Sequence, residues 1–103
     1  MRVAFFGDIV GKTGRQKLES SLEQYVVAEK IDFVVANAEN ATSGAGLSAN
    51  HAEDLLNASV DCITLGDHAY DNKEIIPLLA QTKKIVRPIN YSDECPGQGW
   101  QIF

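Results

Sequence analysis

Hydrophobic runs alternate with amphipathic stretches along the whole chain. Residues 3–6 form a continuous apolar run, which is typical of a parallel strand covered on both faces, and residues 33–36 and 62–65 form two further, largely apolar runs. Between these runs, apolar residues recur at the spacing of one helix face. The order of strand, helix and strand predicts βαβ units. We therefore predict an α/β fold with a mainly parallel sheet and βαβ crossovers.

Local signals predict where the helices begin. Thr13 and Gln16 form a capping box, which predicts a helix that runs to about residue 29. Ser48 is a favourable N-cap for a second helix. The stripe expected on that helix consists of Ala52, Leu55, Leu56 and Ser59. Asp71 and Glu74 signal a third helix, which Pro77 is expected to keep short or to kink.

The last part of the chain predicts two further strands. Residues 85–86 form the fourth strand, and residues 99–103 begin a fifth. A terminal apolar strand would leave an unpaired edge, which natural domains usually avoid. We therefore interpret residues 1–103 as the N-terminal part of a single, incomplete domain. The alternative is a non-catalytic interaction module, in which this edge pairs with another chain or with a second copy in a homo-oligomer.

Composition and charge limit the classes of partner. The 103 residues are 45% hydrophobic and 22% charged, which is typical of a small globular domain. The net charge is −5 and the nine Lys and Arg residues are scattered, which argues against binding duplex DNA or an anionic membrane. The first apolar run is too short for a signal peptide or a membrane span. These features predict a cytoplasmic protein.

Polar residues follow each of the first three predicted strands. Asp8, Glu39 and Asp67 occupy these positions, and ligands of open parallel sheets bind beyond the carboxyl ends of the strands. A single aspartate there is most simply explained as a helix cap or a solvated turn. Three carboxylates in one crevice would repel one another unless cations lay between them. Asn40 and His68 add an amide and an imidazole, so the whole set favours a metal site.

Such a set of side chains suits the hydrolysis of phosphate esters. Two metal ions about 3.5–4 Å apart can activate water and clamp the phosphoryl oxygens, and a nearby imidazole can protonate the ester oxygen. His68 would take this last role. His51 falls on the predicted second helix without a partner nearby in the sequence, so we interpret it as solvated.

A nucleotide-binding P-loop is the other alternative. Residues 7–13 read GDIVGKT between a predicted strand and a predicted helix. The P-loop motif has four residues between its glycines, and this segment has three, so the loop is too short to wrap a phosphate in that way. Lys12 is then expected to face solvent, and tight binding of a magnesium nucleotide would separate the two interpretations.

Four segments together resemble the YmdB-like branch of the calcineurin-like metallophosphoesterases. They are GDIVGKTGR from Gly7, NAENATSGAGL from Asn37, LGDHAYDNKEI from Leu65 and VRPINY from Val86. The resemblance implies the N-terminal half of a four-layer α/β-β/α sandwich. It also implies a bacterial phosphodiesterase with two iron or manganese ions, whose small phosphate-ester substrates are 2′,3′-cyclic nucleotides.

The resemblance assigns a role to each candidate residue. Asp8 matches a ligand of the first metal, Glu39 the bridging carboxylate, and Asn40 an amide near the bridging water and the phosphate. Asp67 matches a ligand of the second metal, where the family usually has asparagine, and His68 faces the leaving group. The family completes its metal shell with three histidines from a second half. We therefore expect this chain alone to be inactive and to bind Mg or Mn weakly through oxygen donors.

Overall fold

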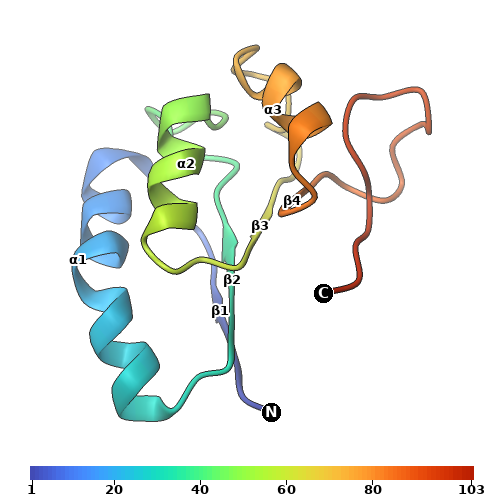
Figure 1. Ribbon diagram of the computed structural model, residues 1–103. Helices are drawn as coiled ribbons and strands as arrows, with labels where there is room; N and C mark the ends of the chain where they lie inside the picture. Colours follow the sequence, from blue (N-terminus) through green and yellow to red (C-terminus); the bar gives the residue numbers. More distant parts are fainter.

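Four parallel strands form one sheet in the computed structural model, which describes all residues 1–103 (Figure 1). The strands are β1 (Val3–Phe6), β2 (Phe33–Asn37), β3 (Cys62–Thr64) and β4 (Ile85–Val86). They lie in the order β1-β2-β3-β4, and each neighbouring pair is parallel. The prediction of an α/β fold with a parallel sheet is confirmed.

One helix connects each pair of successive strands. The helices are α1 (Gly11–Glu29), α2 (Ala49–Asn57) and α3 (Ile75–Gln81). In Figure 1, α1 and α2 lie together on one side of the sheet, and the C-terminal segment lies on the other side. None of the three helices combines the length and the hydrophobicity needed to cross a bilayer.

The core lies between the sheet and the helices. Alternate strand residues such as Val34, Ala36 and Ile63 are buried, as expected when one face of each strand points to the helical layer. Leu22 of α1 and Leu55 of α2 are fully buried in the same cluster. These contacts hold β2 and β3 in the centre of the sheet, so the loops at their carboxyl ends start from a rigid base.

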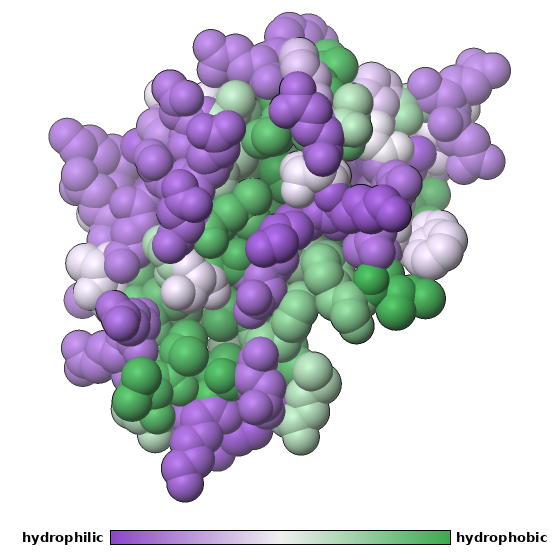
Figure 2. All heavy atoms as spheres, in the orientation of Figure 1, coloured by the Kyte–Doolittle hydropathy of each residue, from purple (hydrophilic) through white to green (hydrophobic).

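The other face of the sheet is only partly covered. Val3 and Phe5 of β1 are 57% and 64% exposed. On this side of the sheet, the ring of Phe103 packs against the ring of Phe33, with the ring centroids 5.0 Å apart. Figure 2 shows hydrophobic residues at the surface between the polar helical layer and the polar loops. The prediction of a first strand covered on both faces is wrong for this chain, because α1 and α2 lie on the same side of the sheet and leave Val3 and Phe5 exposed on the other.

The first helix begins before its predicted capping box. Val10 is the N-cap and makes no side-chain capping bond. The N–H of Gly11 donates instead to the backbone oxygen of Asn40, 3.1 Å away in the loop after β2. A tertiary contact therefore sets the start of α1, and Thr13 lies inside the helix.

The second helix has the predicted cap. The Ser48 side chain accepts a hydrogen bond from the N–H of His51 at 3.2 Å. The helix ends at Asn57, so Ser59 is not part of its buried stripe. Ser59 is exposed and has a φ of 76°, which places it in the turn that leads to β3.

The third helix is short, as predicted. Pro77 is its third residue, and backbone N–H groups in the first turn have no acceptor within the helix, so proline is tolerated there. The predicted capping role of Asp71 is wrong. The helix begins after Glu74, and the Asp71 carboxylate bonds to His68 instead.

The predicted fifth strand does not form. Residues 99–103 are irregular, and the only pairing beyond β4 is a single bridge between Val86 and Gln98. The chain then crosses to the uncovered face, where Phe103 meets Phe33. The edge pairing proposed for residues 99–103 therefore lacks the strand on which it depended.

Candidate functional site

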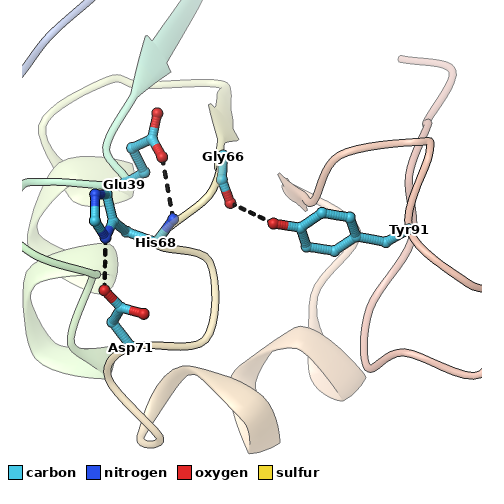
Figure 3. A network of polar contacts seen from close by, with 5 residues as sticks. All are labelled: Glu39, Gly66, His68, Asp71 and Tyr91. Carbon is cyan, nitrogen blue, oxygen red and sulfur yellow. Dashed lines mark hydrogen bonds and ion pairs between the residues drawn. The ribbon is translucent and has the colours of Figure 1, made fainter.

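The carboxylate of Glu39 lies against the turn that follows β3. Its Oε2 accepts a hydrogen bond from the backbone N–H of His68 at 3.2 Å (Figure 3). A Cβ atom at Gly66 would collide with both carboxylate oxygens, so glycine at this position allows the close approach. The structure thus brings the end of β2 and the Gly66–His68 turn together at the carboxyl edge of the sheet.

Backbone hydrogen bonds extend the sheet up to these residues. The N–H of Ala38 donates to the oxygen of Thr64 at 3.0 Å, and the N–H of Leu65 donates to the oxygen of Val86 at 2.9 Å. Gly46, with a φ of 81°, packs its backbone against Asn72, where a Cβ would come within 2.9 Å of the Asn72 nitrogen. The loop after β2 and the loop after β3 are therefore packed on each other.

Asp71 pairs with the imidazole of His68. The Nδ1 atom of His68 lies 2.6 Å from Oδ2 of Asp71, and both side chains are about half exposed (Figure 3). This hydrogen bond raises the pKa of His68, burial opposes it, and the charges of Asp71, Glu39 and Asp67 add to the increase. Because Nδ1 is held by Asp71, Nε2 is the ring nitrogen left for a ligand.

We predict that Asp71→Asn lowers the pKa of His68 toward its ordinary value of about 6.5. The substitution removes the largest cause of the increase, so the imidazole loses its proton at lower pH. An NMR titration of the His68 ring protons measures this change. Asp67→Asn is the matched control and should lower the pKa less, because Asp67 contributes only through its charge. An unchanged pKa in Asp71→Asn would show that the pair does not form in solution.

The remaining candidate residues are at the same edge but do not converge. Asp8 is exposed, has a φ of 55° and connects β1 to α1, a conformation that aspartate tolerates better than most residues. Asp67 is exposed, and neither side chain makes a hydrogen bond within the chain. Asn40 is half-buried and contacts α1 through its backbone. No three His, Cys, Asp or Glu side chains lie close enough to hold a metal ion together.

Tyrosines from two loops support the turn after β3. The hydroxyl of Tyr91 donates to the backbone oxygen of Gly66 at 3.2 Å (Figure 3). The ring of Tyr91 lies 6.0 Å from that of Tyr70, whose hydroxyl donates to the oxygen of Pro96 at 2.6 Å. Sequence reasoning missed both residues, because nothing in the local sequence links residue 91 to residue 66.

The prediction that His51 is solvated and has no partner is wrong. Its Nδ1 lies 2.8 Å from the hydroxyl of Thr42, and that hydroxyl accepts a hydrogen bond from the N–H of Ser48 at 2.8 Å. The hydroxyl proton is therefore available to His51, and the imidazole fastens the glycine-rich loop to α2. The loop brings Thr42 back to the helix, a contact that sequence spacing does not reveal.

The segment that resembles a P-loop lacks the features of a phosphate cradle. Lys12 is exposed, as expected from the short loop. The N–H of Gly11 at the start of α1 already donates to Asn40. A P-loop leaves such backbone N–H groups free for phosphate, so this arrangement does not favour the nucleotide-binding alternative.

Comparisons with known proteins give a consistent result. The family model described as YmdB-like protein matches residues 4–103. The 2′,3′-cyclic-nucleotide 2′-phosphodiesterase of Bacillus subtilis is 35% identical over 99 residues, which are 96% of this chain and 38% of that protein. A putative phosphatase/phosphodiesterase of Mycoplasma genitalium is 37% identical over 90 residues, which are 87% of this chain and 32% of that protein.

Two crystal structures are similar over almost the whole chain. A hypothetical protein from Thermus thermophilus has a TM-score of 0.90 and 38% identity over 100% of this chain and 40% of its own. A novel phosphatase from Mycoplasma pneumoniae has a TM-score of 0.86 and 38% identity over 94% of this chain and 36% of its own. The chain therefore spans about two fifths of the length of these proteins or less.

Proposed function

Because this chain belongs to the YmdB-like protein family, we propose that it supplies part of the active site of a metal-dependent phosphodiesterase. The proposed substrates are small phosphate diesters, 2′,3′-cyclic nucleotides in particular, which the name of the Bacillus subtilis relative specifies. The chain covers 38% of that relative, so the proposal concerns the contribution of these residues to such an enzyme.

The contact between Glu39 and the N–H of His68 carries this proposal. It joins a carboxylate from the end of β2 to the backbone of His68, the residue of the turn after β3 that carries the imidazole. A carboxylate is a suitable ligand for a hard divalent cation, and an imidazole is a suitable proton donor. A metal-dependent phosphodiesterase needs a cation held close to the phosphate and a proton donor near the leaving oxygen.

Three carboxylates would hold the metal ions. Asp8, Glu39 and Asp67 follow adjacent parallel strands and offer oxygen donors, which fit manganese or iron and also magnesium. The side chains of Asp8 and Asp67 have no hydrogen bonds within the chain that would oppose such a role. Two bound cations would supply positive charge that stabilises the phosphoryl oxygens.

His68 would protonate the leaving oxygen of the ester. Asp71 fixes the ring through Nδ1 and raises its pKa, so the proton on Nε2 is retained to a higher pH. A protonated Nε2 can donate to the alkoxide that leaves phosphorus. The side-chain amide of Asn40 would donate a hydrogen bond to a phosphoryl oxygen and orient the substrate.

Asp67 is expected to affect turnover more than binding. The YmdB-like pattern usually has asparagine here, which is a neutral ligand. The extra negative charge of aspartate would lower the Lewis acidity of a bound cation, while its oxygens remain good ligands. The proposed site should therefore retain metal better than it retains activity.

A chimera tests the proposed function. This chain would replace the matched 99 residues of the Bacillus subtilis phosphodiesterase, with the rest of that protein unchanged. We expect Mn²⁺-dependent hydrolysis of 2′,3′-cyclic AMP, followed by ³¹P NMR, and none from the 103-residue chain alone. His68→Gln in the chimera should be at least about 100-fold slower, because general acid catalysis contributes about that much or more.

The unmodified relative is the positive control for this experiment. A chimera that is folded by circular dichroism and binds Mn²⁺, yet leaves the cyclic nucleotide intact, would contradict the proposal. If the chimera hydrolyses the substrate equally fast with His68 and with Gln at this position, the proposed phosphodiesterase function stands, but His68 is not the proton donor.

A further inference from the structure

A cavity of about 630 Å³ lies next to β4 and the C-terminal segment. None of the candidate metal-site residues lines it. We propose that this cavity binds a small molecule through a carboxylate or phosphate group, with Arg87 and Lys83 as the cations that hold the anion. The proposal is independent of the phosphodiesterase function.

Arg87 is buried with much of its hydrogen-bonding capacity unused. The residue is 5% exposed and is the only charged residue of the chain that is buried. Its Nη1 donates to the oxygen of Pro88 at 3.0 Å, and its Nη2 donates to the oxygen of Ser92 at 3.3 Å. A guanidinium has five N–H donors, so three have no acceptor, and Nε is shielded from solvent without any partner.

The charge of Arg87 is also without a counterion in the chain. The two ion pairs of the structure are Arg2 with Glu29 and His68 with Asp71. A buried charge is costly unless it is paired, and backbone oxygens supply partial charge only. The hydrogen bonds to the backbone oxygens of Pro88 and Ser92 stabilise the loop that follows β4. They do not neutralise the positive charge of the Arg87 guanidinium.

The rest of the lining favours an organic anion. Lys83 adds a second positive charge, and Asp93 is the one acidic residue, so the lining is net positive in a chain whose net charge is −5. Trp100 and Ile102 provide an apolar wall and are 65% and 77% exposed. The volume is within the range of small-molecule sites. The fork of the guanidinium suits the paired oxygens of a carboxylate or a phosphate.

Fluorescence of Trp100 provides a direct test, because it is the only tryptophan in the chain and lines the cavity. The chain would be titrated with inorganic phosphate and with acetate, each against chloride at equal ionic strength. We expect a saturable change with phosphate or acetate and none with chloride. The anion that gives the change identifies the group that the cavity prefers.

Neighbouring lysines provide a matched pair of variants. Lys83→Gln should weaken binding by about threefold to fivefold, which corresponds to one solvent-accessible ion pair. Lys84→Gln removes the same charge one residue away, outside the lining, and should leave binding within about twofold. Equal weakening by both variants, or an equal response to chloride, would overturn the proposal.

Arg87→Gln tests the buried cation itself. Loss of its charged hydrogen bonds should weaken binding by at least about tenfold. Circular dichroism would show whether this variant folds, and if it does not, the Lys83 and Lys84 variants decide the question. A folded Arg87→Gln protein that binds phosphate or acetate as well as the parent chain would overturn the proposal.

Discussion

Replacing Asp8 and Glu39 by alanine together is expected to abolish the binding of Mn²⁺ to this chain. The parent chain should bind Mn²⁺ weakly, because no three of its acidic side chains lie together and water has to complete the shell. In the double variant, Asp67 is the only one of the three proposed carboxylate ligands that remains. Affinity should fall by at least about 10- to 100-fold, since the loss of an outer-shell partner already has that effect. Isothermal titration calorimetry measures both affinities.

The control for this experiment removes the same charge elsewhere. Glu53 and Asp54 are exposed on α2, so Glu53→Ala with Asp54→Ala lowers the negative charge equally without touching the sheet edge. This variant should bind Mn²⁺ as the parent does. If both double variants bind equally, the acidic chain attracts the cation only in a general way, and these carboxylates form no site.

Truncation of Ile63 to alanine is expected to lower the free energy of unfolding by about 2–5 kcal/mol. Ile63 is fully buried in β3 and pairs with Ala36 on one side and Ile85 on the other. Its side chain therefore fills the centre of the core between the sheet and the helices. A domain of this size has about 5–15 kcal/mol of total stability, so a large share of it would be lost.

Urea unfolding followed by circular dichroism measures this loss. Val27→Ala is the control, because Val27 is 73% exposed on α1 and its truncation should change stability by no more than about 0.5 kcal/mol. A loss for Ile63→Ala as small as that of the control would mean that β3 is not the packed centre of the sheet. The Gly66–His68 turn follows β3 directly, so the same variant should also weaken metal binding.

The sequence predicts the elements whose signals are local. The apolar runs locate β1, β2 and β3 to within one residue, because a buried strand needs such a run wherever it lies. Ser48 locates the start of α2, because its cap depends only on the next turn. The start of α1 is different. It is set by the backbone oxygen of Asn40, which lies far from Gly11 in the sequence.

The same distinction applies to the candidate site. Strand ends reveal which carboxylates share one edge of the sheet, so Asp8, Glu39 and Asp67 can be named without a structure. The partner of His68 cannot be named in that way, because Asp71 also carries a plausible local role as a helix cap. Residues 99–103 show the same limit, since an apolar segment can enter a sheet or, like Phe103, pack across one.

The strands follow one another in the sheet in the order in which they occur in the chain. Each strand pairs with the next across about 20 to 30 residues, so no pairing has to wait for a distant segment. The loops that close are therefore shorter than those that would join distant parts of the chain, which limits the entropy cost of each closure. A nascent chain with this topology can add its strands one at a time, beginning at the N-terminus, while synthesis continues.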